Sequence, residues 1–241
     1  MKKYLYFFFL LLTIPSYNLY ATIGDDIISP VTNSEAQKVL LIGASTTLIA
    51  SFFKNTLIKK MQKDLYEDQP LCCKLTAPGN AYLQILPNIL YSLSYGLNFY
   101  LNDNEDSKRK AIGMAKATLY SGMMTEILKH SIYEKRPNGG GNSSFPSGHT
   151  TSAFAFASFV ASEHPWYVGV PAYILASYVG FCRMHDNKHY LQDVMAGATI
   201  GMSYGVAMSL KSKEDAEKKS AFIITPTEEL KGVAVKYTLQ F

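Results

Sequence analysis

Cationic side chains, histidines and a Ser-Gly-His turn are concentrated between residues 129 and 193. The cations suit an anion with several oxygen atoms, because an arginine fork matches phosphate oxygens in pairs and a lysine adds a point charge. Backbone amides at the start of the apolar stretch after the turn would bind the same anion. The segment therefore predicts a phosphate-binding site built from Lys129, Arg136, Ser147, Gly148, His149, Arg183, His189 and Asp193.

His189 and Asp193 are four residues apart, a spacing that places two side chains on one face at the start of a helix. A carboxylate there would accept a hydrogen bond from one imidazole nitrogen and leave the other as a nucleophile. His149, between the loop and the next apolar stretch, would protonate the leaving oxygen as a general acid. The pattern thus contains a nucleophile, its orienting group and an acid.

Several of these residues, taken singly, have structural explanations. Lys129 and Arg136 could be solvated residues near a helix end, and Ser147 could be a simple N-cap. His130 and His164 are predicted to be structural, since the first only neighbours a lysine and the second lies in a polar break. The functional prediction rests on the combination of side chains.

A metal site is the rival interpretation. His185, His189 and Asp193 step by four residues and offer ligands for zinc. The neighbouring cations Arg183 and Lys188 would repel a metal ion and suit an anion, so we expect the anion site. The chain has no Gly-rich Walker motif with a lysine, which argues against a nucleoside triphosphatase.

Three spaced motifs give this stretch a family resemblance. It resembles the signature of the type 2 phosphatidic acid phosphatase superfamily, which also includes class A acid phosphatases and vanadium-dependent haloperoxidases. With its neighbouring helices the signature covers about residues 111–210. The motifs are Lys129 with Arg136-Pro137, then Pro146-Ser147-Gly148-His149, then Arg183 with His189 and Asp193.

The resemblance implies a phosphate cradle. Lys129, Arg136 and Arg183 would hold the phosphate oxygens. Ser147 and the backbone amide of Gly148 would complete the cradle. No metal or other cofactor is implied.

The resemblance also implies a two-step reaction. His189, oriented by Asp193, would attack phosphorus, and His149 would protonate the leaving alkoxide. Water would then hydrolyse the phosphohistidine. One departure from the family is Cys182, which stands where the family usually has serine and removes one hydroxyl donor.

The composition limits the class of protein. The chain has 241 residues, of which 48% are hydrophobic and 17% charged, and a formal net charge of +4. A charged share below the globular average of about 25% suggests a well-covered or membrane-contacting surface and excludes a disordered chain. The net charge is too small and scattered for a nucleic-acid surface. No linker separates two domains, so one domain is expected.

Six apolar segments are predicted to be helices, because they are rich in Ala, Gly, Ser, Met and Leu and most are 12 to 21 residues long. The fold class is therefore mainly α, a helical bundle. Charged stretches at 54–68, 102–110 and 211–219 are predicted to be solvated connections. The predicted helices are residues 39–53, 81–101, 111–128, 151–162, 166–182 and 191–210.

Membrane integration is expected in preference to a soluble periplasmic bundle. The low charge and the repeated apolar segments exceed what soluble helical domains usually show. Only 81–101 and 191–210 reach the length of about 20 residues that a span needs. Gly197, Gly201 and Gly205 recur at a spacing that suits close helix packing, in a membrane or in a soluble core.

The N-terminus has the three regions of a secretory signal peptide. Lys2 and Lys3 precede an apolar run at 4–14 and a short polar stretch that ends at Ala21. Residues 1–21 are predicted to be a signal peptide, with an uncleaved anchor as the alternative. The chain is expected in the bacterial inner membrane with a periplasm-facing site, or in the periplasm.

The C-terminus changes character after the last helix. Apolar residues alternate with polar or small ones after a turn region, which predicts a terminal β-hairpin packed on the helices. The expected organisation is a signal peptide at 1–21, a helical phosphatase domain at 22–220 and a hairpin-like tail at 221–241. The alternating residues are Val233, Val235, Tyr237, Leu239 and Phe241.

An apolar helical body with an exported site resembles the lipid-phosphate branch of the superfamily. We expect a membrane enzyme that hydrolyses lipid phosphate monoesters or pyrophosphates, such as phosphatidic acid, phosphatidylglycerol phosphate, polyprenyl pyrophosphate or lipid A. The alternative is a soluble class A-type acid phosphatase that acts on small organic phosphates. Vanadate-dependent halide oxidation is disfavoured by the short chain, and a phosphate-binding protein without turnover would need neither His189 nor His149. The sequence does not indicate an oligomeric state.

Overall fold

The structure, a computed structural model, describes residues 19–67, 76–227 and 232–237, and these are mainly helical. The mainly α fold class is therefore confirmed. The predicted helices are all present and all longer than predicted, as α3 and α5 to α9. The elements are α2 (Leu19–Thr32), α3 (Ser34–Phe52), η1 (Lys54–Ile58, a π-helix), α4 (Lys59–Glu67), α5 (Thr76–Asn102), α6 (Glu105–Ile132), α7 (Gly148–Glu163), α8 (Trp166–His185), α9 (Leu191–Ala221), β1 (Phe222–Thr227) and β2 (Gly232–Tyr237).

The three charged stretches that were predicted to be connections are largely helical. Residues 54–67 form η1 and α4, and residues 211–219 continue α9. At the second stretch, Asn104 accepts a hydrogen bond from the backbone amide of Ser107 at 2.9 Å, so this N-cap starts α6 inside the charged run. Charge alone did not distinguish a solvated helix from a connection.

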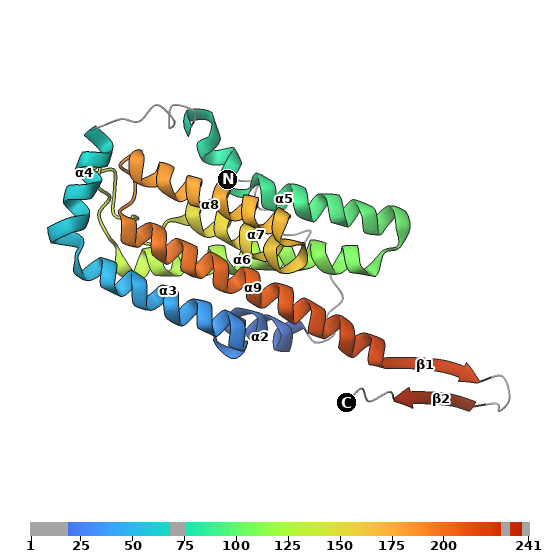
Figure 1. Ribbon diagram of the computed structural model, residues 1–241. Coiled ribbons are helices and arrows are strands. Elements are labelled where there is room, and N and C mark those ends of the chain that lie inside the picture. The colour runs from blue at the N-terminus through green and yellow to red at the C-terminus, as the bar shows by residue number, and fades with distance from the viewer. Residues whose placement is uncertain (1–18, 68–75, 228–231, 238–241) are drawn as a thin grey trace.

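The bundle is built around α9, which packs against α3, α6 and α7 (Figure 1). Helix α8 packs on α7, and α5 packs on α6 and α7. Helix α2 is joined to the bundle through Asp26, a 1% exposed residue that pairs with Lys116 at 2.8 Å and Lys211 at 2.7 Å. The chain thus places α7 and α9 at the centre and the other helices around them.

The predicted close packing at the glycine triple is present between α9 and α7. A Cβ atom on Gly197 would come within 2.5 Å of the Ser147 carbonyl oxygen. A Cβ atom on Gly201 would overlap the carbonyl oxygen of Thr151. The two backbones approach so closely that only glycine fits at these points.

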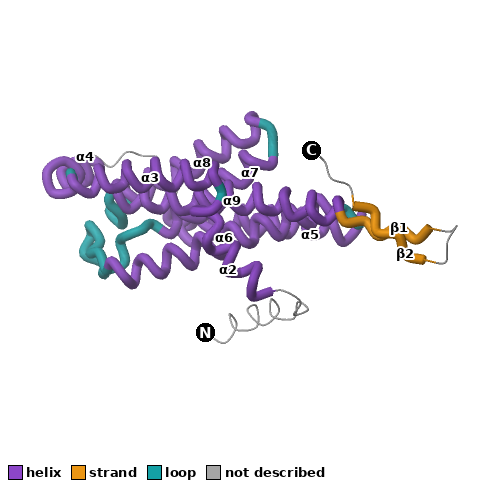
Figure 2. Tube along the Cα trace, turned by 90° about the horizontal axis from the view of Figure 1, so that it is seen from below, coloured by secondary structure: helices purple, strands orange, loops and turns teal. Residues whose placement is uncertain are grey.

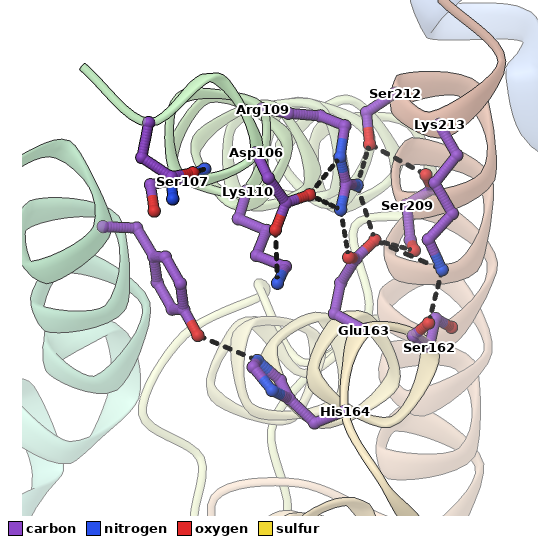
Figure 3. A network of polar contacts seen from close by, with 12 residues as sticks. Asp106, Ser107, Arg109, Lys110, Ser162, Glu163, His164, Ser209, Ser212 and Lys213 are labelled. Carbon is purple, nitrogen blue, oxygen red and sulfur yellow. Dashed lines mark hydrogen bonds and ion pairs between the residues drawn. The ribbon is translucent and has the colours of Figure 1, made fainter. Parts of the chain in front are cut away.

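A network of ion pairs and hydrogen bonds ties α6, α7 and α9 at the end of α7 far from residue 148 (Figure 3). Arg109 on α6 donates from both terminal nitrogens to the two carboxylate oxygens of Glu163, at 2.9 and 2.6 Å. Ser209 on α9 donates to the same carboxylate, whose side chain is only 1% exposed. Because a buried carboxylate is costly unless it is paired, this network fixes the register of the three helices.

Strands β1 and β2 pair antiparallel, with Phe222 opposite Tyr237 and Thr227 opposite Gly232. They extend beyond the end of the bundle, as both overall views show (Figures 1 and 2). The expectation that this tail packs on the helices is therefore wrong. Leu239 and Phe241 lie outside the described residues, as do residues 1–18 of the predicted signal peptide.

Among the described residues, no single helix has both the length and the apolar composition needed to cross a bilayer. The bent pair Ser34–Phe52 with Lys54–Glu67 meets the requirement jointly, with an angle of 62° between its two parts.

Substitution of Gly201 tests the close approach of α7 and α9. Gly201→Ala should lower the free energy of unfolding by about 1–3 kcal/mol, because the added methyl group pushes the two backbones apart. Gly122→Ala is the matched control, since a Cβ atom at Gly122 meets nothing within 4 Å. Thermal unfolding followed by circular dichroism should show a loss for the first variant and no loss for the second. Equal behaviour of the two variants would contradict the packing argument.

Candidate active site

The loop between α6 and α7 brings the first two motifs to one end of the bundle. Helix α6 ends at Ile132 and is capped by Tyr133, a left-handed residue with φ 52°. Gly139 and Gly141 have φ values of +75° and +114°, a conformation that explains the glycine-rich sequence of the loop. The Asn138 amide donates to the carbonyl of Asn187 at 3.0 Å. This bond joins the loop to the turn between α8 and α9, which carries the third motif.

Ser147 and Gly148 start α7 and lie in the wall of the site. Ser147 occupies the N-cap position, but its side chain makes no capping bond. It is fully buried, its amide donates to the carbonyl of Asp193 at 2.9 Å, and its hydroxyl accepts from Thr150 at 2.9 Å. Lys129 Nζ lies 3.1 Å from the point where a Cβ atom on Gly148 would be. The lysine is therefore beside the N-terminus of α7.

The two arginines approach the site from different segments, Arg136 from the loop after α6 and Arg183 from α8. Arg183 lies in the last turn of α8, is 3% exposed and donates to Asp186 at 2.7 Å. Arg136 donates to the hydroxyl of Ser143 at 3.2 Å, and its Nε is buried without a hydrogen-bond partner among the described residues. An anion bound beside Arg136 could accept a hydrogen bond from this buried Nε.

His189 is held by a backbone carbonyl, which differs from the expected bond to Asp193. Its Nδ1 lies 2.7 Å from the carbonyl oxygen of Ser144, which can only accept, so Nδ1 carries the proton. Asp193 Oδ2 is 3.9 Å from Nδ1 and instead accepts from the Ser144 hydroxyl at 2.6 Å and the Tyr190 amide at 2.8 Å. The physical reason is that α9 begins at Leu191, so His189 precedes the helix. Asp193 and His189 are thus linked through Ser144, which bonds to both.

The electrostatics keep the imidazole neutral. Burial and, to a smaller extent, the charges of Arg136, His149 and Arg183 lower the pKa of His189 from 6.5 to about 3, although the bond to Ser144 opposes this shift. Burial also raises the pKa of Asp193 to about 6. A neutral His189 with the proton on Nδ1 has its lone pair on Nε2, which is the form that a nucleophile requires.

The eight predicted residues are therefore gathered at one end of the bundle. Ser144 was missed, because a serine in a Gly- and Ser-rich loop has no distinguishing pattern in the sequence. His164 bonds to Tyr91 at 2.8 Å at the other end of the bundle (Figure 3). Exposed His130 bonds to the carbonyl of Glu126 at 2.7 Å on its own helix.

The three residues of the rival zinc site do not lie on one helix face, although their spacing in the sequence suggested that they would. His185 ends α8, His189 lies in the turn, and Asp193 is in α9, so the three do not share a helix face. Within residues 19–67, 76–227 and 232–237, no group of three or more His, Cys, Asp or Glu residues has an arrangement that could hold a metal ion.

Comparison with known proteins singles out the same part of the chain, since residues 110–215 match the PAP2 superfamily. The resemblance to the type 2 phosphatidic acid phosphatase superfamily is thus confirmed, and the matched residues include all eight predicted site residues. Cys182, in place of the usual serine, is 3% exposed and directly precedes Arg183.

Proteins that are similar to this chain include named lipid phosphatases. A lipid A 1-phosphatase from Porphyromonas gingivalis is 39% identical over 99 residues, which are 39% of this chain and 21% of that protein. A probable diacylglycerol pyrophosphate phosphatase 1 from Schizosaccharomyces pombe is 25% identical over 154 residues, 45% of this chain and 55% of that protein. The chain spans less than two thirds of the length of either relative. The crystal structure of Aquifex aeolicus LpxE is 22% identical, with a TM-score of 0.49, and the match covers 65% of this chain and 96% of that chain.

The tautomer and charge of His189 can be measured directly. With a pKa near 3, its imidazole should remain neutral and protonated on Nδ1 between about pH 5 and pH 8. Nitrogen chemical shifts of isotope-labelled histidine, assigned by the loss of one signal in His189→Asn, report this state. A His189 signal that titrates with a midpoint near 6.5 would contradict the predicted pKa.

Proposed function

We propose that the chain is a metal-independent phosphatase that hydrolyses lipid phosphate monoesters or pyrophosphates through a phosphohistidine. The observation that carries the proposal is the hydrogen bond from His189 Nδ1 to the carbonyl of Ser144, with two arginines around the imidazole. A purely phosphate-binding protein needs the cations but has no use for a buried neutral imidazole with a free lone pair.

In the first step Nε2 of His189 attacks phosphorus, and the bond from phosphorus to the ester oxygen breaks. His149 gives its proton to the leaving alkoxide, which departs as an alcohol. In the second step His149 takes a proton from water, the water oxygen bonds to phosphorus, and the phosphorus–nitrogen bond breaks. Inorganic phosphate leaves, and both histidines return to their starting states.

The cations stabilise the charge that develops on the phosphate oxygens. Arg136, Arg183 and Lys129 would contact these oxygens, with the α7 amides as further donors. Asp193 has an indirect role, because it accepts from the Ser144 hydroxyl and so fixes the segment whose carbonyl orients His189. The positive site favours attack, since it holds the anionic transition state more tightly than the neutral imidazole alone could.

A lipid substrate is supported by the distribution of polar and apolar side chains. Small polar residues, among them Ser121, Thr125, Thr151, Ser158 and Ser203, are buried between the helices. Large apolar residues point outward, whereas soluble monomers rarely expose extensive apolar patches. More than half of the residue surface is exposed for Leu41, Ile42, Leu48 and Phe52 on α3, Leu93, Leu97 and Leu101 on α5, and Trp166, Ile174 and Leu175 on α8.

The names of the relatives support the same class of substrate, since both refer to phosphorylated lipids. We place the enzyme at the bacterial inner membrane, with the site on the periplasmic face. A soluble class A-type acid phosphatase would share the catalytic residues, and it would not need the outward apolar side chains.

Phosphate release from a panel of substrates tests the activity. The panel contains lipid phosphates, a polyprenyl pyrophosphate and a water-soluble aryl phosphate, all assayed with EDTA. The wild type should prefer the lipids, and His189→Ala should lose at least about 10³-fold in kcat because the nucleophile is absent. His130→Ala is the matched control and should keep its activity.

His149→Ala separates acid catalysis from binding. The loss should be about 10²–10⁴-fold for lipid esters, whose alkoxides are poor leaving groups, and much smaller for the activated aryl phosphate. Equal losses on both substrates would remove the acid role. Activity confined to the aryl ester would favour the acid phosphatase, and inhibition by EDTA that zinc reverses would favour a metal enzyme.

Membrane fractionation tests the proposed lipid contact. A version in which residues 1–21 are replaced by an efficiently cleaved signal peptide should stay in the membrane pellet after an alkaline carbonate wash, because its apolar side chains contact lipid. A soluble periplasmic marker should be released by the same wash. Release of the protein with the marker would overturn the membrane proposal.

A further inference from the structure

A pocket of about 490 Å³ lies next to the phosphate cradle and is strongly basic. Its wall includes Lys54, Lys59, Lys135, Arg136 and Tyr190. We propose that this pocket binds a second phosphate group of the substrate while the first phosphate group lies against His189. The inference rests on the proposed function and narrows it to esters that carry two phosphate groups.

The pocket depends on η1 and α4, which lie at the end of the bundle where the loops gather (Figures 1 and 2). Gln62 on α4 is 3% exposed, and its amide donates to the carbonyl of Met184 and to Asn187 Oδ1. These bonds fix α4 on the turn that carries the third motif. Lys54 and Lys59 are thus brought to the site by a segment outside the PAP2 match.

The charges of the pocket are only partly compensated. Lys54 forms an ion pair with Glu134, and its Nζ lies 4.5 Å from the centre of the Tyr190 ring. Lys59 and Lys135 have no ion-pair partner among the described residues. Asp193 is close enough to Lys54 to act on it electrostatically, as Glu134 does. The four cations that line the pocket outnumber these two carboxylates, and the excess of positive charge suits a dianion such as phosphate.

Arg136 links the pocket to the cradle. It lines the pocket, and it is also one of the charges that lower the pKa of His189. A guanidinium group has five donors and can serve oxygens of two phosphate groups at the same time. The pocket volume lies in the usual range for small-ligand sites of about 300–1,000 Å³, so it has room for a phosphate and the atoms that connect it.

The two phosphate groups can be bonded to each other, as in a diphosphate ester, or be separated by a linker in one lipid. Both share the chemistry that the pocket recognises. Kinetics on a monophosphate lipid, its diphosphate analogue and a lipid with two separated phosphates distinguish the two sources.

The variant that tests the pocket is Lys59→Gln, which leaves the cradle intact. Lys63→Gln is its matched control, because Lys63 is one turn further along the exposed side of α4 and outside the pocket.

Lys59→Gln should raise KM about tenfold for one or both substrates with two phosphates, which corresponds to the loss of one charge-assisted hydrogen bond. Its kcat, its KM for the monophosphate and all parameters of Lys63→Gln should change less than about twofold. An equal rise of KM for mono- and diphosphorylated substrates, or no rise for either, would overturn the second subsite and leave the proposed function intact.

Binding without turnover separates the two proposals. Titration calorimetry with alkyl monophosphonates, methylene diphosphonate and a hexamethylene diphosphonate measures anion binding to the wild type and both variants. If no substrate is turned over, the proposed function fails. A selective loss of diphosphonate binding in Lys59→Gln would still support the subsite, and equal binding to all three proteins would overturn it.

Discussion

The proposed nucleophile, the imidazole of His189, has to stay neutral and fixed in a site that is positive enough to hold phosphate. Burial and the nearby arginines remove the proton that His189 would otherwise gain, and the carbonyl of Ser144 holds the one that remains on Nδ1. A carboxylate in direct contact would raise the pKa of the imidazole and favour its charged form. A neutral carbonyl acceptor fixes the same tautomer and raises the pKa less. The negative charge of Asp193 is instead one hydrogen bond away, on the hydroxyl of the same serine.

This arrangement depends on the register of α6, α7 and α9, because each of them carries part of the site at one end. The glycine contacts bring α7 and α9 so close that the Ser147 amide reaches the carbonyl of Asp193. At the other end of the same helices, the pairing of Arg109 with Glu163 resists sliding, since any shift would leave a buried carboxylate unpaired (Figure 3). The site geometry is therefore maintained from both ends of the bundle.

The helices and the cluster of cations were predictable, because hydrophobic segments and motif spacing are local properties of the chain. The spacing of Gly197, Gly201 and Gly205 likewise predicted a close helix contact. The contacts of Ser144 and Gln62 were not predictable, since each depends on a partner brought near only by folding: His189 is 45 residues from Ser144, and Met184 is 122 residues from Gln62. Helix α4 was missed because its charged residues resemble those of a solvated connection. Its buried residue is the polar Gln62, so the helix has no apolar pattern to reveal it.

The distribution of side chains links the proposed chemistry to the proposed substrate. The polar interior supplies hydrogen bonds that fix the helices, and the apolar exterior would contact the acyl chains of a bilayer. The phosphate cradle lies at the end of this apolar body, so a lipid could place its head group in the cradle while its chains remain beside the helices. The basic pocket is lined by residues of the same end, including Lys54 of η1 and Lys59 of α4. Head-group phosphates would thus be selected by charges at the end of the bundle, and the lipid chains would need only a nonspecific apolar surface.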